Sequence, residues 1–210
     1  MGQLKEHLVI SLGCEYGCGG SAIGKKIAEK LDIAYYDRQI VDKIMEEVGV
    51  TPSLMNLAEK GIDISGLRAE EGYANAPTKY TNLTDRMVYL QKEIIKKLAA
   101  KSSCLIVGRC SDYILRDRKD CVNIYVYAPM DIRLKNVEDE LKLDEKKAKE
   151  TIEENDNNLH ARYLQITGTD WGERHNRQIL IDSSVLGVEG TADYLVEFIK
   201  KFYAKVYPEG

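Results

Sequence analysis

The hydrophobic pattern of this chain alternates between two kinds of segment. In one kind, apolar residues form short continuous runs, which predict buried strands; in the other they recur every three or four positions, which predicts helices. The predicted strands are residues 8–12, 33–36, 104–108, 123–129 and 178–184. The predicted helices are one carrying Ile23, Ile27 and Leu31, then 37–48, a short one after Pro52 ending near Gly61, 83–100, 130–141 and a last one beginning near Gly190. This alternation indicates an α/β fold.

A glycine-rich turn joins the first predicted strand to the first predicted helix. It contains Gly13, Gly17, Gly19, Gly20 and Gly24. Glycines let the backbone bend tightly and turn its N–H groups inward, while the following helix presents unpaired N–H groups and the positive end of its dipole. The segment therefore predicts a phosphate-binding loop; the alternative is a glycine-rich turn that binds nothing.

The first interpretation of this loop is a P-loop. Gly19, Gly20 and Ser21 then occupy the G-K-[ST] end of the motif, and Ser21 is placed to offer its hydroxyl to Mg²⁺. Two positions depart from the motif. Cys14 stands where its first glycine belongs, and Gly20 stands where its phosphate-binding lysine belongs.

The second interpretation is a dinucleotide-binding turn. Gly17, Gly19 and Ala22 satisfy G-x-G-x-x-[GA], and Asp37 follows Gly17 by twenty residues at the end of a predicted strand. This match is formally better, although glycine-rich turns with a later acidic residue often arise by chance. Both interpretations therefore stay open on the loop alone.

The interval after the second predicted strand favours the kinase interpretation. Residues 62–82 lose periodicity and gather Gly, Ser, Asn and Pro, which predicts a long functional loop. About 65 residues without an obvious strand separate the second predicted strand from the third, whereas a dinucleotide-binding fold winds strand, helix and strand in such an interval. A nucleotide kinase places a helical acceptor-binding region there.

Several arginines are candidate phosphate ligands. Arg109 directly follows the strand 104–108, and ligands of open α/β sheets bind beyond the carboxyl ends of strands. Arg133 lies near the start of helix 130–141. The strongly charged stretch 142–177 predicts either a helical segment that closes over a site, with Trp171 anchoring its return, or a solvated helical arm. Its arginines, any of which could reach a transferring phosphoryl group, are Arg162, Arg174 and Arg177.

Composition narrows the class of ligand. The chain has 210 residues with 44% hydrophobic content, enough for the core of one domain with an attached subdomain. A net charge of −4 and the lack of a basic stripe argue against nucleic acid as a partner, so small ligands are favoured. No apolar run is long enough to span a bilayer, which predicts no membrane partner and a cytoplasmic protein.

Five cysteines, an odd number without a C-x-x-C pair, predict reduced thiols. Cys104 and Cys121 lie in or beside predicted strands, where core packing is the expected role. Cys14 and Cys18 lie near a helix N-terminus, which lowers the pKa of a thiol. No histidine stands beside them, so the favoured interpretation gives them no reactive role.

Together these segments resemble the bacterial cytidylate-kinase-like family. The resemblance runs in order over nearly the whole chain, and the segments that carry it are ISLGCEYGCGGSAIGKKIAEKLDIAYYDRQIV, LIVGRCSDYILRD, NIYVYAPMDIRLKNV, NDNNLHARYLQITGTDWG and LIDSSVLGVEG. It implies one P-loop kinase-like domain over residues 1–210, with a five-stranded parallel sheet flanked by helices. It also implies a helical acceptor-binding region at about 37–100, a helical lid at about 142–177, and ATP and Mg²⁺ as cofactors.

The resemblance also assigns residues. Its phosphate-binding loop matches Gly17, Cys18, Gly19, Gly20 and Ser21. Asp37 and Arg109 match acceptor-nucleotide contacts, and Arg133 matches an arginine near the phosphates; with Arg109 and Arg162 it makes up the catalytic candidates. Two cations of the family pattern are missing, because Gly20 replaces the loop lysine and Leu159 follows Asp156 where the lid has an arginine.

Three functions follow as hypotheses. The first is phosphoryl transfer from ATP to a nucleoside monophosphate such as CMP or dCMP. The second is a nucleotide-binding sensor or interaction protein of the same fold with weak or no catalysis, because phosphoryl transfer depends on positioned cations. The third, NAD-dependent oxidoreduction, is disfavoured by the missing early strand. The sequence leaves the oligomeric state open.

Overall fold

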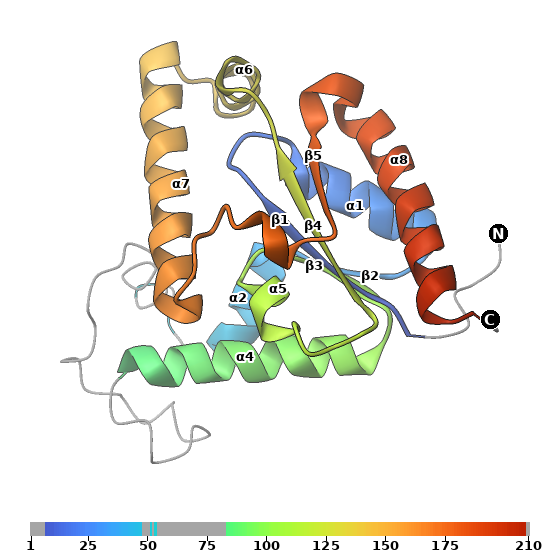
Figure 1. Ribbon diagram of the computed structural model, residues 1–210. Helices are drawn as coiled ribbons and strands as arrows, with labels where there is room; N and C mark the ends of the chain where they lie inside the picture. Colours follow the sequence, from blue (N-terminus) through green and yellow to red (C-terminus); the bar gives the residue numbers. More distant parts are fainter. Residues whose placement is uncertain (1–6, 48–50, 52, 54–82, 209–210) are drawn as a thin grey trace.

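The computed structural model describes residues 7–47, 51, 53 and 83–208 (Figure 1). The predicted short helix after Pro52 and the predicted loop 62–82 lie outside these residues. The strands are β1 Val9–Cys14, β2 Ala34–Tyr36, β3 Cys104–Val107, β4 Cys121–Tyr127 and β5 Ile179–Asp182. The helices are α1 Gly20–Leu31, α2 Arg38–Glu47, α4 Leu83–Lys101, α5 Ser111–Ile114, α6 Met130–Leu141, α7 Glu145–Thr167, the 3₁₀ helix η2 Arg174–Asn176, and α8 Ser183–Val206.

The strands form one five-stranded sheet in the order β2-β3-β1-β4-β5, and every neighbouring pair is parallel. β1 lies at the centre, where Val9 pairs with Cys104 of β3 on one side and Cys121 of β4 on the other. The predicted five-stranded parallel sheet flanked by helices is therefore confirmed. Parallel strands need crossover connections, and helices supply them here.

Alternate residues of the central strand serve two cores. Leu8, Ile10 and Leu12 face α1 and α8, and Ile23 and Ile27 of α1 pack against them. The opposite side of the sheet, where Val9 lies, is covered by α4, α5 and the end of α7. Figure 1 shows α1 and α8 together on one face of the sheet and α4 along the other. Both faces are buried, as is usual for parallel sheets.

The predicted core positions of the cysteines agree with this packing. Cys104 and Cys121 are buried in the second core, together with Cys110. Burial raises the pKa of each of these three thiols to about 12. All five cysteines are free thiols.

The start of the last helix differs from the prediction. α8 begins at Ser183, because the Asp182 carboxylate accepts a hydrogen bond from the Ser184 N–H at 2.9 Å. Gly187 then interrupts the helix with φ 65° and ψ −176°, so the long second part of α8 begins directly after Gly187, close to the expected start near Gly190. The prediction missed only the turn from Ser183 to Leu186. An Asp at the N-cap satisfies an orphan N–H group, which accounts for the earlier start.

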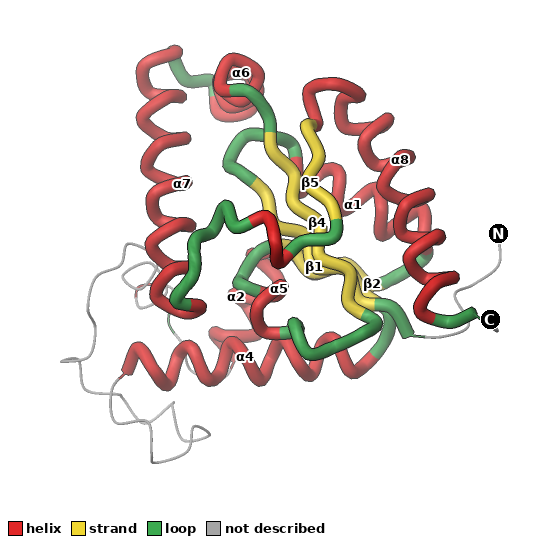
Figure 2. Tube along the Cα trace, viewed as in Figure 1, coloured by secondary structure: helices red, strands yellow, loops and turns green. Residues whose placement is uncertain are grey.

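The carboxyl ends of the strands carry the segments that sequence analysis singled out. Figure 2 shows the loop between β1 and α1 bending below α6, beyond the ends of the strands. The predicted lid, residues 142–177, consists of α7, a turn and η2. Within the described residues, no helix combines the length and the apolar character that crossing a membrane requires.

Candidate functional site

The glycine-rich loop has the conformation of a tight anion-binding turn. Gly17 and Gly19 both have φ 80°, the left-handed region that favours glycine. A Cβ on Gly17 would also lie 2.9 Å from Val137 and 3.1 Å from the Arg133 carbonyl oxygen, so this position admits no side chain. Gly19 is the N-cap of α1, which places the N-terminus of that helix directly after the turn.

Surrounding side chains hold the carbonyl groups of the loop. Arg133 Nε donates to the Tyr16 carbonyl at 2.7 Å, Asn136 Nδ2 to the Gly17 carbonyl at 2.8 Å, and Ser183 Oγ to the Cys18 carbonyl at 2.8 Å. Carbonyl groups that are fixed toward the protein are typical of phosphate-binding nests. The N–H groups of Glu15, Tyr16 and Cys18 donate to acceptors within the protein, so a phosphate on this loop would meet the N–H groups of other loop residues and of the start of α1.

Arg133 lies behind the loop and is only 5% exposed. Besides Tyr16, it binds the carboxylates of Asp156 and, at 3.2 Å, Glu15. The Tyr16 N–H donates to the other oxygen of Asp156 at 3.0 Å. Burial raises the pKa of Glu15, against the opposing effect of Arg133. Arg133 does not line the cavity described below; it holds the loop and α7 together.

Cys14 explains why no lysine stands at position 20. A Cβ on Gly20 would lie 2.7 Å from Cys14 Sγ and closer still to Cys14 Cβ. Gly20 is the first residue of α1, and its φ does not lie in the left-handed region, so the backbone itself would accept a side chain there. The contact with Cys14 is what excludes one. Cys14 and Gly20, the two departures from the P-loop motif, therefore form one structural feature: the Cys14 side chain fills the space that a side chain at position 20 would need.

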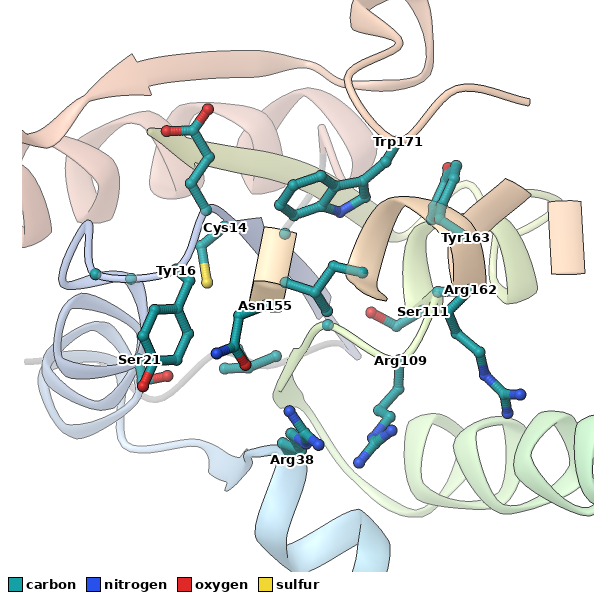
Figure 3. A pocket seen from close by; sticks show the side chains of 18 of the residues that line it. Cys14, Tyr16, Ser21, Arg38, Arg109, Ser111, Asn155, Arg162, Tyr163 and Trp171 are labelled. Atoms are coloured by element: carbon teal, nitrogen blue, oxygen red, sulfur yellow. The ribbon is translucent and has the colours of Figure 1, made fainter. Parts of the chain in front are cut away.

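A cavity of about 650 Å³ extends from the loop across the carboxyl ends of β1 and β3. One end is lined by the loop, from Gly17 to Ser21 with Tyr16 and Cys14. The other end is lined by Arg38, Arg109, Arg162 and Arg177. Figure 3 shows Ser21 and Cys14 at the loop end, with Arg109 and Arg162 at the opposite end. A cavity with an amide-lined end and an arginine-lined end suits two anionic groups.

Arg109 stands in a strained turn after β3. Gly108, Arg109 and Cys110 have φ of 66°, 57° and 56°, three successive left-handed residues. Gln91 Nε2 holds the Arg109 carbonyl at 2.8 Å, and Nη2 of Arg109 contacts both carboxylate oxygens of Asp42 on α2. Left-handed backbone at a non-glycine residue persists only where its surroundings enforce it and is concentrated at functional sites. Arg109 lines the cavity, as its place after a strand predicts.

The predicted lid supplies one wall of the cavity. Asn155, Leu159 and Arg162 of α7 line it. Arg162 is buried and donates to Gln91 Oε1 at 3.4 Å, so it lies at the arginine end. Leu159 lines the cavity beside Asn155 and Arg162. Arg109 and Arg162 are thus brought to the same end of the cavity, and Arg133 is not.

A group of residues that sequence analysis did not connect closes the arginine end. The side chain of Arg177 is 1% exposed and lies over the Tyr125 ring, 4.5 Å from its centroid. It donates to Asp112 at 3.3 Å and to the Trp171 carbonyl at 2.7 Å, and Asp112 also accepts from the Tyr163 hydroxyl at 2.9 Å.

Within this group, the Trp171 ring packs edge-on against Tyr125, with centroids 5.6 Å apart. Trp171 therefore anchors the returning segment, as predicted. Arg177 binds the same segment through the Trp171 carbonyl, so its guanidinium is engaged within the protein. From the sequence only the charge of Arg177 could be predicted, not these contacts.

Asp37, the predicted acceptor ligand, does not line the cavity. Its carboxylate accepts from the Ile40 N–H at 2.9 Å and caps α2. The next residue, Arg38, does line the cavity. The lysines that follow the loop point elsewhere: Lys26 forms an ion pair with Glu189 of α8, and Lys25 is exposed.

The donor groups fit a nucleotide with Mg²⁺ better than a protein-bound metal. Among the described residues, no cluster of three or more His, Cys, Asp or Glu side chains is suited to a metal ion. Mg²⁺ is commonly held by few protein groups together with substrate phosphates and water. Ser21 is exposed at the loop end of the cavity, where its hydroxyl would hold the ion beside phosphates on the loop.

Comparison with solved structures agrees with this architecture. An uncharacterized protein from Eubacterium ventriosum superposes with a TM-score of 0.71 at 21% identity, covering 92% of this chain and 99% of that one. Shikimate kinase from Bacteroides thetaiotaomicron superposes with a TM-score of 0.54 at 14% identity, covering 92% and 98%. At these identities the likeness shows the fold alone. A search of curated protein sequences finds no match.

Comparison with family models is more specific. The model described as the cytidylate kinase-like family matches residues 9–185, from the first residue of β1 to the first turn of α8. The matched range includes the glycine-rich loop, the turn that carries Arg109, and the whole of α7. The chain therefore belongs to the cytidylate kinase-like family.

Proposed function

We propose that the protein binds ATP with Mg²⁺ and transfers a phosphoryl group to a nucleoside monophosphate of the CMP or dCMP type. The observation that carries the proposal is the cavity with a backbone phosphate cradle at one end and arginines at the other. Phosphoryl transfer needs two anionic substrates held in line, and the two ends of this cavity supply different means of binding them.

The residues take separate roles in this proposal. Gly17, Cys18, Gly19, Gly20 and Ser21 bind the phosphates of ATP, and the Ser21 hydroxyl helps to hold Mg²⁺, which bridges phosphate oxygens and neutralises charge. Arg109 and Arg162 bind the acceptor phosphate, with Arg38 beside them. Arg133 acts through the loop, because it holds the Tyr16 carbonyl and Asp156.

The proposal divides the chain functionally. Residues 1–210 form one kinase-like domain, in which about 37–100 bind the acceptor and about 142–177 act as the lid. α7 already contacts the loop through Asp156, so the lid needs no large movement to close the loop end. The partners are small-molecule nucleotides, without nucleic acid or membrane.

A second candidate function is nucleotide binding with slow or absent transfer. Gly20 occupies the position of the loop lysine with Cys14 packed against it, Leu159 occupies that of the lid arginine, and Arg133 is bound by two carboxylates. The loop end of the cavity is lined by Glu15, Glu140 and Glu154 and by no lysine or arginine of residues 13–22. Transfer depends on positive charge near the transferring group, whereas binding by backbone amides does not.

The order of the strands argues against an NAD-dependent enzyme. In the dinucleotide-binding fold the second strand lies beside the first, so that its terminal acid reaches the ribose. Here β3 separates β2 from β1, and Asp37 caps α2. The acid of the sequence motif therefore does not stand where a dinucleotide would need it.

Two measurements test the proposal. Thermal unfolding with ATP, GTP, CMP, dCMP and NAD, each with and without Mg²⁺, identifies the ligand, because a ligand at a hundred times its dissociation constant adds about 2.7 kcal/mol of stability. A coupled assay of ADP release then measures transfer to CMP. Binding of ATP without transfer would favour the second candidate, and stabilisation by NAD alone would overturn both.

A further inference from the structure

Two cysteines lie together in the phosphate-binding loop. Cys14 ends β1 and Cys18 stands between the left-handed glycines Gly17 and Gly19. Both sulfurs lie beside one point, because a Cβ on Gly20 would lie 2.7 Å from Cys14 Sγ and 3.4 Å from Cys18 Sγ. The absence of a side chain at position 20 is what allows the two thiols to meet.

The two thiols differ in access and in charge. Cys14 lines the cavity, whereas Cys18 is 2% exposed and donates to the Val126 carbonyl at 3.5 Å. The hydrogen bond from Cys14 and one from the Gly20 N–H lower the pKa of Cys18. The same pairing, together with burial, raises the pKa of Cys14. The pair therefore joins an accessible thiol, Cys14, to a buried thiol of lowered pKa, Cys18.

We propose that Cys14 and Cys18 form a redox-sensitive dithiol, which a small hydroperoxide entering the cavity oxidises reversibly to a disulfide that weakens phosphate binding by the loop. The first part stands on the geometry of the two thiols. The second part rests on the proposed function, because it assumes that the loop binds phosphate. Cys104 and Cys121 pack in the second core and do not line the cavity. Cys110 lines the cavity, but burial raises its pKa to about 12, and no second cysteine adjoins it in the glycine-rich loop.

The reaction has two steps. Cys14, which lines the cavity, attacks one oxygen of hydrogen peroxide; a sulfur–oxygen bond forms, the oxygen–oxygen bond breaks, and the departing hydroxide takes the proton of the Cys14 thiol to become water. Cys18 then attacks the sulfenic sulfur of Cys14; the sulfur–sulfur bond forms, the sulfur–oxygen bond breaks, and the departing hydroxide takes the Cys18 proton to leave as a second water. Two thiols are oxidised and one peroxide is reduced. A dithiol reductant restores the pair by thiol–disulfide exchange.

Disulfide formation must displace Cys18. Two bonded sulfurs lie about 2.05 Å apart, so Cys18 Sγ leaves the Val126 carbonyl and moves against Cys14. Gly17 and Gly19 adjoin Cys18, and their N–H groups are those expected to meet a phosphate. Movement of Cys18 therefore reorients the N–H groups of Gly17 and Gly19. The hydrogen bond from Ser183 Oγ to the Cys18 carbonyl opposes this movement.

Peptide masses test the first part. The protein is treated with hydrogen peroxide, blocked with iodoacetamide and digested with trypsin, which releases residues 6–25 as one peptide with both cysteines. We expect this peptide to lose two hydrogen atoms and to escape alkylation, and dithiothreitol to reverse both changes. The Cys121→Ala control should behave identically. Two alkylated thiols in the peptide after oxidation, or disulfides only between other cysteines, would overturn the proposal.

Affinity for MgATP tests the second part. We expect the oxidised protein to bind MgATP at least tenfold more weakly than the reduced protein in calorimetry, and dithiothreitol to restore binding. In each of the variants Cys14→Ser and Cys18→Ser, the affinity for MgATP should be the same before and after treatment with peroxide. Unchanged affinity of the oxidised unmodified protein would refute the regulatory part. If the reduced protein binds no MgATP, the proposed function fails, and the peptide masses still decide whether the dithiol exists.

Discussion

The side chain of Cys14 fills the space that a side chain at Gly20 would need. Cys14 Sγ lies 2.7 Å from the position of a Cβ at residue 20, well inside van der Waals contact. The sequence records two separate departures from the P-loop motif at these positions. The structure joins them, since a lysine at position 20 requires a glycine at position 14.

This relationship predicts the behaviour of lysine at position 20. Gly20→Lys alone should lower the free energy of unfolding by about 1–3 kcal/mol, because it overpacks the contact with Cys14. Cys14→Gly combined with Gly20→Lys should recover most of that loss and raise CMP phosphorylation roughly 10-fold or more, with Leu159→Arg adding to the gain. Urea unfolding and ADP release measure the two effects, and Cys14→Gly alone is the control. A Gly20→Lys protein as stable as the unmodified one would contradict the steric argument.

Arg109 allows its side chain and its backbone to be tested separately. Arg109→Ala should weaken CMP binding by about 1.5–3 kcal/mol, the scale of a charge-assisted hydrogen bond. Arg109→Gly should weaken binding equally, yet be more stable than Arg109→Ala by roughly 1 kcal/mol, because φ 57° favours glycine. Calorimetry and thermal unfolding give the two values. Unchanged CMP affinity in both variants would remove Arg109 from the acceptor site.

Asp156 joins α7 to the loop, and its removal should loosen both. Asp156→Ala deprives the buried Arg133 and the Tyr16 N–H of a partner, so we expect a loss of about 1.5–3 kcal/mol in urea unfolding together with weaker MgATP binding. Lys149→Ala, which breaks an exposed pair with Glu153 on the same helix, is the matched control and should change stability by less than about 0.5 kcal/mol. Equal effects of the two variants would show that Asp156 does not support the loop.

The thiol pair predicts a pH dependence. Because the hydrogen bond from Cys14 lowers the pKa of Cys18, ultraviolet absorbance should show one thiolate titrating before an ordinary thiol does. A depressed pKa stabilises the folded state above the unfolded value, and this stabilisation is lost as the pH falls through the folded value. Cys18→Ser should abolish the early titration and Cys121→Ala should leave it, since the pKa of Cys121 is raised to about 12. An early titration that survives Cys18→Ser would assign it to another group.

The fold was largely predictable because its signals are local. Apolar runs placed the five strands, and helical spacing placed the helices that follow them. The sequence pattern did not predict the short helix α5, because four residues are too few to show a helical period. The break at Gly187 was also not predicted, because two possible helix starts, the Asp182 N-cap and the Gly190 region, lie close together in the sequence.

A site residue was predictable only where its place next to a strand in the sequence determines its place in the structure. Arg109 follows a strand directly, so its place in the cavity was accessible from sequence. Arg133 lies in the first turn of α6, after β4, and Asp156 on another helix holds its side chain behind the loop; no local pattern shows that pairing. Its catalytic role, like that of Arg162, stays a prediction. Asp37 and Arg38 are adjacent, and only the start of α2 decides which of them reaches the cavity.

The central position of β1 also governs how the protein is made. Both neighbours of β1 are synthesised much later, since Val9 pairs with Cys104 and Cys121. Pairings between residues so distant in sequence slow folding, because chain closure precedes any gain in contacts. On the ribosome, the apolar residues of β1 must therefore wait without a sheet until β3 and β4 have emerged. β1 gains its second neighbour only when the chain has been made as far as β4.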